Sequence, residues 1–367
     1  VLLGANWDEI PRMVRMGGLI ALTVCTQCFG LHKFKSGNEQ GGTALFFLGN
    51  IFYGASIVLI AQIYHLGEHM PDGIFWWALG CVPFALLARS PWIALQTMLL
   101  AFIWASLEVS MGYYPYLALV FILTGVGVLY LGRQSVLLFL SVAGSIGLFI
   151  EYSLVEFWQE NGFYELQAEH LIVTVALFII AYAFSHWLSI LQSSRAKDYG
   201  AVLAAWSLRF AIICLLVMTF EGPWEELIRA NWENGNSMFL ISLTLVCGAV
   251  YFAFKAGKMF PITAIIPLFV LSVALLMGTT TTADAVLFQI ATNILLVVSG
   301  IWLIVRGIHS GISHYFFLGV VSVISVAFLR YVDLIGDYIG GSILFMFFAA
   351  LLLGAARYWK VYNAGRR

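Results

Sequence analysis

Charged residues are scarce in this chain of 367 residues, where lysine, arginine, aspartate and glutamate together make up only 10%. Soluble domains carry about 25% charged and about 45–50% apolar residues, whereas 62% of this chain is hydrophobic. So few charges cannot cover the surface of a chain this long, which excludes an ordinary water-soluble globular protein. The formal net charge of −1 leaves no basic face for nucleic acid, so no nucleic-acid partner is expected.

Signatures of soluble enzymes and of disulfide-stapled domains are missing as well. The chain has no glycine-rich phosphate loop and no G-x-S-x-G elbow. Its five cysteines all lie inside apolar runs and do not form a disulfide framework. Cys25 and Cys28 stand three residues apart on an expected helix, where we expect packing rather than redox or metal chemistry. We therefore expect no cofactor, and we favour a function other than that of an enzyme while keeping a membrane enzyme as an alternative.

Long apolar runs dominate the chain instead, and each is close to the length that crosses a bilayer as a helix. The predicted spans are 13–31, 43–64, 74–88, 92–108, 114–132, 135–152, 170–192, 199–219, 237–256, 261–278, 284–305, 311–330 and 339–357. The fold class is thus an all-α integral membrane protein, a bundle of about thirteen spans (range 11–14) forming one transmembrane domain over residues 1–367. As an alternative, the two spans around Arg89-Ser90-Pro91 form one hairpin that does not cross fully.

Lysine and arginine fall in every second break between the spans, which predicts the orientation of the chain. The positive breaks are HKFK (32–35), Arg89, Arg133, SSRAKD (193–198), KAGK (255–258), Arg306 and the tail after Arg357. The alternate breaks are acidic or neutral, including 65–73, 151–169, 221–234, 279–284 and 333–338. We expect a multi-pass protein of the bacterial inner membrane with the positive breaks and the C-terminus in the cytoplasm.

The charged opening GANWDEIPRMVRM (4–16) then begins outside, with residues 1–12 in the periplasm. VLLG (1–4) has the character of the last turn of a helix, so we expect a further span and a cytoplasmic segment before Val1. Arg12 and Arg15 go against the positive-inside bias in this arrangement. The alternative is that these two arginines are cytoplasmic anchors and that one later span is miscounted.

Two of the outer breaks have the pattern of short helices lying in the membrane interface. In WEELIRANWE (224–233) the apolar residues recur at helical spacing and the charged ones lie elsewhere. LVEFWQENGFYEL (154–166) is a second candidate, interrupted at Asn161-Gly162. Pro267, inside its span, predicts a kink.

The first hundred residues resemble a known family. GANWDEIPR (4–12), the span after it, and G-x(4)-L-I-A-Q-I-Y-H-L followed by P-D and a tryptophan-rich span (54–79) are similar to the bacterial membrane proteins called domain of unknown function 2157. The similarity covers mainly residues 4–100. Members usually start with a cytoplasmic segment and a span that ends at the Asn-Trp-Asp stretch, which implies an outer position for Asp8. The resemblance implies no activity.

Polar side chains inside spans are costly and are therefore candidates for function. Arg209 lies near the middle of its span, where we expect it to face the bundle interior and contact a carbonyl, an acidic group or an anionic substrate. His186 is either a hydrogen-bonded packing residue or a proton-coupling group. Gln289 and Asn293 share one helix face, and like Asn50 they are explained by hydrogen bonds between helices.

A second set of candidates gathers at the predicted outer face. Its members are Asp8, Glu9, Gln62, Tyr64, His65, Glu68, His69, Asp72, Arg330, Asp333 and Asp337. They either line one outward-opening polar cavity or belong to ordinary solvated loops. Clustered histidines and carboxylates can bind a metal, but the spacing His-Glu-x-x-His is absent, so no metal site is predicted.

These observations favour three functions, in decreasing order. The first is transport or translocation of a small or amphipathic, lipid-like substrate, with a bound lipid as ligand. The second is a non-catalytic membrane subunit or scaffold that holds a membrane-protein partner. The third is an outer-face membrane enzyme acting on a lipid-linked substrate, since integral-membrane glycosyltransferases of the C class have a similar layout, with an acidic pair in the first outer loop.

Overall fold

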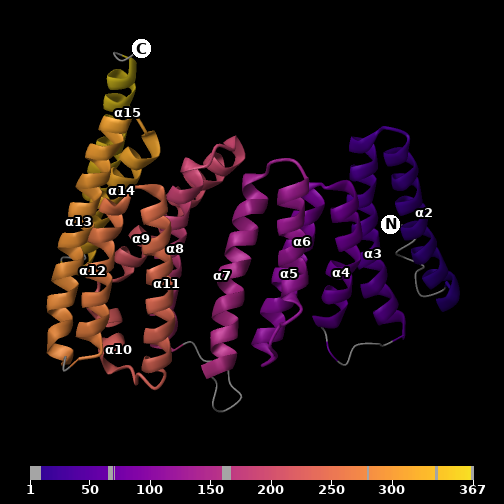
Figure 1. The fold of residues 1–367 in the computed structure, drawn as a ribbon, viewed down its shortest axis with the longest axis horizontal. Helices are drawn as coiled ribbons and strands as arrows, with labels where there is room; N and C mark the ends of the chain where they lie inside the picture. Colours follow the sequence, from indigo (N-terminus) through magenta and orange to yellow (C-terminus); the bar gives the residue numbers. More distant parts are fainter. Residues whose placement is uncertain are drawn as a thin grey trace. The chain divides into compact units, whose positions relative to one another are not determined.

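The computed structural model describes residues 10–64, 69, 71–158, 167–278, 281–334 and 338–364, which form helices and no strand (Figure 1). The chain divides into two compact units, residues 1–166 and 167–367. The prediction of a single transmembrane domain is left open by this division, which concerns packing alone.

The helices follow one another with short connections. Unit 1 contains α2 (Arg12–Lys35), α3 (Glu39–Tyr64), α4 (Pro71–Ala88), α5 (Pro91–Ser110), α6 (Ala118–Leu131) and α7 (Val136–Trp158). Unit 2 contains α8 (Ala168–Ile190), α9 (Ser194–Val217), α10 (Glu221–Arg229), α11 (Gly235–Ala256), α12 (Met259–Leu276), the 3-10 turn η2 (Thr282–Asp284), α13 (Ala285–Ser310), α14 (Ser313–Leu334) and α15 (Tyr338–Ala364). Each predicted span coincides with one of these helices.

Ten helices in the described residues are long and apolar enough to cross a membrane, so the fold class is confirmed as a polytopic helical membrane protein. Both α4 and α5 are among the ten, so each is long enough to cross, and the alternative of an incomplete hairpin around Arg89 stays open. The remaining predicted spans fall on α6, α12 and α15. Pro267 lies inside α12 as expected, and the kink stays a prediction.

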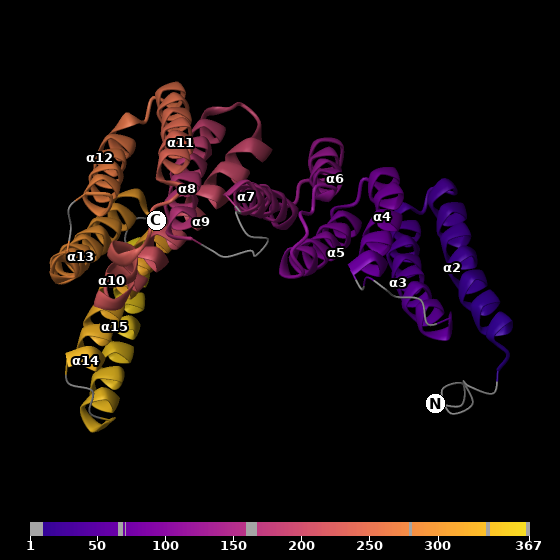
Figure 2. The same ribbon diagram turned by 90° about the horizontal axis from the view of Figure 1, so that it is seen from below.

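Unit 1 is held together by close contacts between consecutive helices. In the view of Figure 2, α4 lies beside both α3 and α5. Gly54 of α3 allows this approach, because a Cβ there would collide with the indole of Trp77 on α4. The indole nitrogen of Trp77 donates a hydrogen bond to the carbonyl oxygen of Asn50 at 2.7 Å. A small residue facing a large one is a usual way for membrane helices to pack.

Unit 2 is built around two sets of helices, in which α8 packs on α9 and α11 while α13 packs on α14. The second pair meets at backbone distance. A Cβ on Gly319 would collide with the carbonyl oxygen of Gly300, and one on Gly307 would lie 2.5 Å from the backbone nitrogen of Phe316. Side chains would hold these two helices apart, so the glycines set their separation.

Within each unit, the connections rich in lysine and arginine share one end. In Figure 1 the α2–α3, α4–α5 and α6–α7 connections of unit 1 lie at the same end, and so do the α8–α9, α11–α12 and α13–α14 connections of unit 2. The short helix α10 lies at the other end of unit 2. The positive breaks that alternate along the sequence therefore lie together at one end of each unit.

The interfacial helix predicted at 224–233 forms as α10, which ends earlier, at Arg229. Trp224 and Leu227 are its buried residues, and the ring of Trp224 stacks on Phe288 at 5.0 Å. The second candidate, 154–166, is described only to Trp158, where it continues α7 rather than starting a new helix. Residues 159–166 lie outside the described residues.

Candidate functional site

A histidine–carboxylate cluster lies at the end of unit 1 opposite the α2–α3, α4–α5 and α6–α7 connections. Glu108, in the last turn of α5, is only 8% exposed. The Nε2 atom of His69 lies 3.1 Å from each of its two carboxylate oxygens. The indole nitrogen of Trp104, one turn earlier, donates to Oε1 at 2.9 Å. The ring of Tyr113 packs edge to face against that of His69, with 5.1 Å between the ring centroids, so an aromatic side chain borders the His69–Glu108 contact.

Asp72 completes this cluster from the first turn of α4. One ligand atom each of His69, Asp72 and Glu108 lies within 4.8 Å of the others, which is a grouping able to hold a metal ion. His69 and Asp72 are among the candidates predicted from the sequence, whereas Glu108 and Trp104 are not, because they come from another helix. One signal does point here: His65 and His69 stand four residues apart, a spacing that metal-binding helices use. His65 itself is outside the described residues.

Hydrogen bonds between neutral polar side chains join α2, α3 and α5 inside unit 1. Fully buried Asn50 accepts a hydrogen bond from Gln27 of α2 at 3.0 Å and donates one to Gln96 of α5 at 3.2 Å. The hydroxyls of Thr23 and Ser56 bond across α2 and α3 at 3.1 Å. The prediction that Asn50 forms hydrogen bonds between helices is confirmed, and these bonds hold the helices together.

Unit 2 contains a group of positive and aromatic side chains near its lysine- and arginine-rich end. The guanidinium carbon of Arg306 lies 4.8 Å from the ring centroid of Trp302 and 5.3 Å from that of Tyr315. Tyr182 of α8 faces the same guanidinium within hydrogen-bonding reach. Arg306 is half-buried, and no carboxylate among the described residues forms an ion pair with it. We call Tyr182, His186, Lys258, Arg306 and Tyr315 the cationic cluster.

His186 of α8 belongs to this cluster and is 6% exposed. Its ring meets Tyr182 edge to face at 4.6 Å, and Lys258 and Arg306 are near enough to act on it electrostatically. Its buried Nε2 atom has no hydrogen-bond partner among the described residues. The hydrogen bond that the sequence suggested for His186 is therefore not found at Nε2 among the described residues, and this buried nitrogen lies close to two positive side chains.

Arg330 contributes to a different contact in unit 2. Its Nη2 donates to the carbonyl oxygen of Thr219 at 2.8 Å, and its guanidinium lies over the ring of Phe220 at 5.3 Å. Asn293 donates to the same carbonyl at 3.2 Å, so this bond joins α13 to the connection between α9 and α10, whereas a bond between two helices was expected. Arg330 therefore ties α14 to the segment between α9 and α10.

Arg209 corrects the sequence prediction. It is exposed, with its guanidinium carbon 5.0 Å from the ring centroid of Trp206, whereas we expected it in the bundle interior. The buried face of α9 is formed by smaller residues such as Leu203, Ala204 and Ser207, and Arg209 shares the opposite face with Trp206. Cys25 and Cys28 are likewise exposed on α2, contrary to the packing role expected for them.

The other outer-face candidates are only partly described. Gln62 and Tyr64 are exposed at the end of α3, where the hydroxyl of Tyr64 lies 3.7 Å from the sulfur of Met13. Asp8, Glu9, His65 and Asp337 are outside the described residues, and Asp333 lies in α14 with its side chain undescribed. Gln62 and Tyr64 belong to unit 1 and Arg330 to unit 2, so the single outer cavity stays a prediction.

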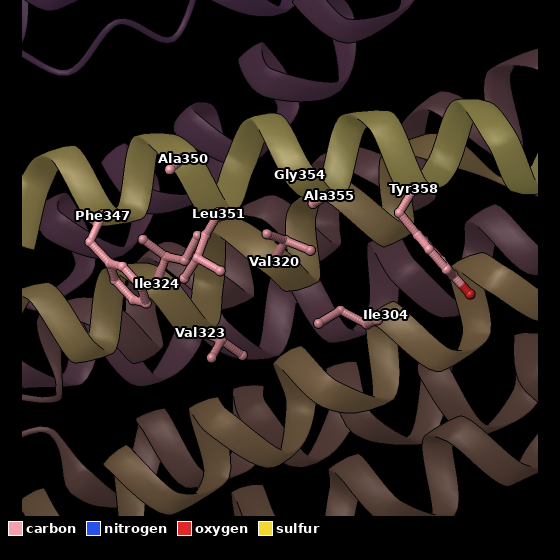
Figure 3. A pocket seen from close by; sticks show the side chains of 10 residues that line it. All are labelled: Ile304, Val320, Val323, Ile324, Phe347, Ala350, Leu351, Gly354, Ala355 and Tyr358. Atoms are coloured by element: carbon pink, nitrogen blue, oxygen red, sulfur yellow. The ribbon is translucent and has the colours of Figure 1, made fainter.

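An apolar groove of 520 Å³ runs along α13, α14 and α15 (Figure 3). Its walls are aliphatic and aromatic, and the only hydroxyl in its lining is that of Tyr358, at one end. Ligand sites commonly measure about 300–1,000 Å³. The groove can therefore accept a hydrocarbon chain and offers almost nothing to a polar molecule.

Comparison with known proteins supports the family resemblance. The model of the family described as predicted membrane protein (DUF2157) matches residues 1–94. The matched residues include α2, α3 and α4 and end in the first turn of α5, within unit 1. No curated protein and no solved structure matches the chain. The match confirms the resemblance seen in the opening residues and describes a membrane protein without naming an activity.

Proposed function

We propose that the chain is a transport or translocation protein of the bacterial inner membrane, and that its substrate is an anionic, amphipathic, lipid-like molecule. The cationic cluster carries this proposal. Arg306 is half-buried and Lys258 is exposed, both bring positive charge close to His186, and no carboxylate of the described residues pairs with Arg306. A positive group without an acidic partner favours an anion, so a phosphate or carboxylate group of the substrate is the partner that fits.

The aromatic side chains around Arg306 suit this role. Trp302 and Tyr315 hold the guanidinium by cation–π contacts, each worth about 0.5–1 kcal/mol where solvent reaches them. Such contacts orient an arginine without neutralising it. The apolar groove of the same unit supplies a surface for the hydrocarbon part of the substrate.

The proposed orientation has the C-terminus in the cytoplasm and residues 1–12 in the periplasm. Segregation of lysine and arginine to one end of each unit supports it. The cationic cluster would then meet substrate from the cytoplasmic leaflet. Labelling with a membrane-impermeant maleimide tests this: Thr282→Cys should react from outside intact cells, and Ala196→Cys only after lysis. The reverse pattern would contradict the orientation.

Native mass spectrometry of the gently solubilised full chain tests the ligand. We expect the wild type to retain an anionic amphipathic molecule, and the double variant Arg306→Gln/Lys258→Gln to lose most of it. The matched control is Lys255→Gln/Arg357→Gln, which removes two exposed positive charges near the ends of α11 and α15. Equal retention in both double variants, or no anionic molecule in the wild type, would contradict the proposal.

Movement of the substrate needs a second measurement. Chains reconstituted in vesicles should speed the exchange of a fluorescent anionic lipid between leaflets, and Arg306→Gln/Lys258→Gln should abolish the effect. Retention of ligand without exchange would leave a lipid-binding membrane protein and reject translocation.

The exposed Arg209 favours a second candidate function, that of a membrane subunit with a protein partner. A charge in the middle of an apolar span is costly against lipid, and Trp206 beside it is 49% exposed. A membrane-protein partner covering this face of α9 would remove that cost. Arg209→Ala should then release a protein that co-purifies with the wild type, while leaving the retained lipid unchanged.

A further inference from the structure

We propose that His69, Asp72 and Glu108 form a binding site for a divalent transition-metal ion, with zinc as the best fit. The three ligand atoms already lie within 4.8 Å of one another. Ligand atoms around a tetrahedral zinc stand roughly 3.3 Å apart when each lies about 2.0–2.1 Å from the metal. The required movement is small, and Asp72 can supply it because its side chain is exposed in the first turn of α4.

The charge balance of the cluster favours a cation. Two carboxylates stand against one histidine, which neutralises at most one of them. Among the described residues no lysine or arginine lies within ion-pair distance of Asp72 or Glu108. Glu108 is buried and contacts His69 and the Trp104 indole, but Asp72 adds a second negative charge to the cluster. A divalent ion balances both carboxylates while leaving His69 neutral.

The surroundings of Glu108 hold it as a metal ligand is usually held. The Trp104 indole donates to Oε1, which fixes the direction of the carboxylate. The backbone carbonyl of Glu108 accepts hydrogen bonds from Met111 at 3.0 Å and Tyr113 at 2.9 Å, so the end of α5 is also fixed. Hydrogen bonds of this kind orient ligands and commonly change metal affinity by about 10–100-fold.

The donor set narrows the choice of ion. One imidazole nitrogen with two carboxylate oxygens suits zinc and manganese, whereas magnesium and calcium favour oxygen ligands alone. Three protein ligands leave a fourth position open to water or another molecule. The site lies in unit 1, so it is independent of the cationic cluster proposed for substrate in unit 2.

Metal analysis of the purified full chain tests the proposal. After treatment with a chelator, the chain is dialysed against Zn²⁺ and the bound metal is counted. We expect about one zinc per chain that depends on the cluster. His69→Gln and Glu108→Gln should each weaken binding on the order of 100-fold, and Trp104→Phe about tenfold, as expected for the loss of a supporting hydrogen bond.

Two controls separate this site from other zinc ligands. Cys25→Ser/Cys28→Ser removes the most plausible thiol site and should leave zinc binding unchanged. Asp72→Asn changes an exposed side chain, so it should fold normally and still weaken binding. Co²⁺ in place of zinc should show visible d–d bands without the near-ultraviolet band of cobalt–thiolate bonds.

Three results would overturn the proposal. The first is a wild-type chain that binds no zinc, and the second is unchanged affinity in both Asp72→Asn and His69→Gln. The third is a zinc site that is lost with Cys25 and Cys28.

Discussion

The polar clusters described in the two units differ in how their side chains are paired. In unit 1 the buried amide of Asn50 pairs with Gln27 and Gln96, and the carboxylate of Glu108 pairs with His69 and Trp104. In unit 2 the Arg306 guanidinium is held by aromatic rings without a carboxylate in the described residues, and the Nε2 atom of His186 is unpartnered there. Both units are apolar helix bundles, so hydropathy does not distinguish them.

This difference distinguishes side chains that join helices from side chains that can bind a ligand. The amide hydrogen bonds of Asn50 join helices and add stability to the bundle. A positive group without a counter-charge adds little stability, but it can bind an anion. We therefore expect substitution of Asn50 to cost stability in unit 1, and substitution of Arg306 to cost ligand binding in unit 2. Three predictions test this contrast, from the largest expected effect on stability to the smallest.

The largest losses should follow Gly→Ala substitutions where helices meet. Gly319→Ala sets a Cβ against backbone, the carbonyl oxygen of Gly300, and should destabilise unit 2 by about 3 kcal/mol. Gly54→Ala meets only the Trp77 side chain, which can move, so about 2 kcal/mol is expected. Reversible unfolding in mixed micelles, followed by tryptophan fluorescence, gives both values.

Gly144→Ala is the control for this pair, because no atom lies within 4 Å of a Cβ there. It should be neutral or stabilise its helix by up to about 1 kcal/mol. Equal losses at positions 54, 144 and 319 would show that helix contacts do not decide the effect.

The middle prediction compares one polar group in each unit. Asn50→Leu removes two hydrogen bonds between helices and leaves Gln27 and Gln96 without a shared partner, so about 2 kcal/mol should be lost. Arg306→Met should cost less than about 1 kcal/mol, because the lost cation–π contacts are offset by removal of an unpaired charge. The same unfolding assay measures both variants.

The order of these two effects is the informative result. If Arg306→Met destabilised the chain more than Asn50→Leu, Arg306 would be a structural attachment, and the cationic cluster would lose its main support as a ligand site.

The smallest effects should come from indole hydrogen bonds. Trp104→Phe removes the donor to Glu108, and Trp224→Phe removes the donor to the Met218 carbonyl at 2.7 Å. Each should cost about 1 kcal/mol, with the loss at Trp104 the greater because its acceptor is charged. Thermal denaturation detects the difference, and saturating zinc should enlarge the loss at Trp104 by about 1.4 kcal/mol, because the variant is expected to bind zinc about tenfold more weakly.

Much of the fold follows from the sequence. Every predicted span coincides with a helix, because uniform apolar runs of bilayer length have no alternative way to satisfy the backbone in lipid. The helix at 221–229 was also predictable, since its apolar residues recur at helical spacing. Arg209 shows where such reasoning fails. An apolar helix has no polar face to indicate which side packs, so its exposed face could not be read from residue types.

The candidate sites could likewise be predicted from the sequence only in part. The sequence by itself determined a polytopic helical membrane protein, the alternation of positive and acidic breaks, and His69 and Asp72 as polar residues of one break. Only the tertiary structure decided that Glu108 from α5 joins that pair, and that Arg306, Tyr182 and Tyr315 meet from three helices. Periodicity along a helix is a local property, whereas the partners of a side chain depend on how separate helices pack, and glycine contacts such as Gly319 on Gly300 set that packing.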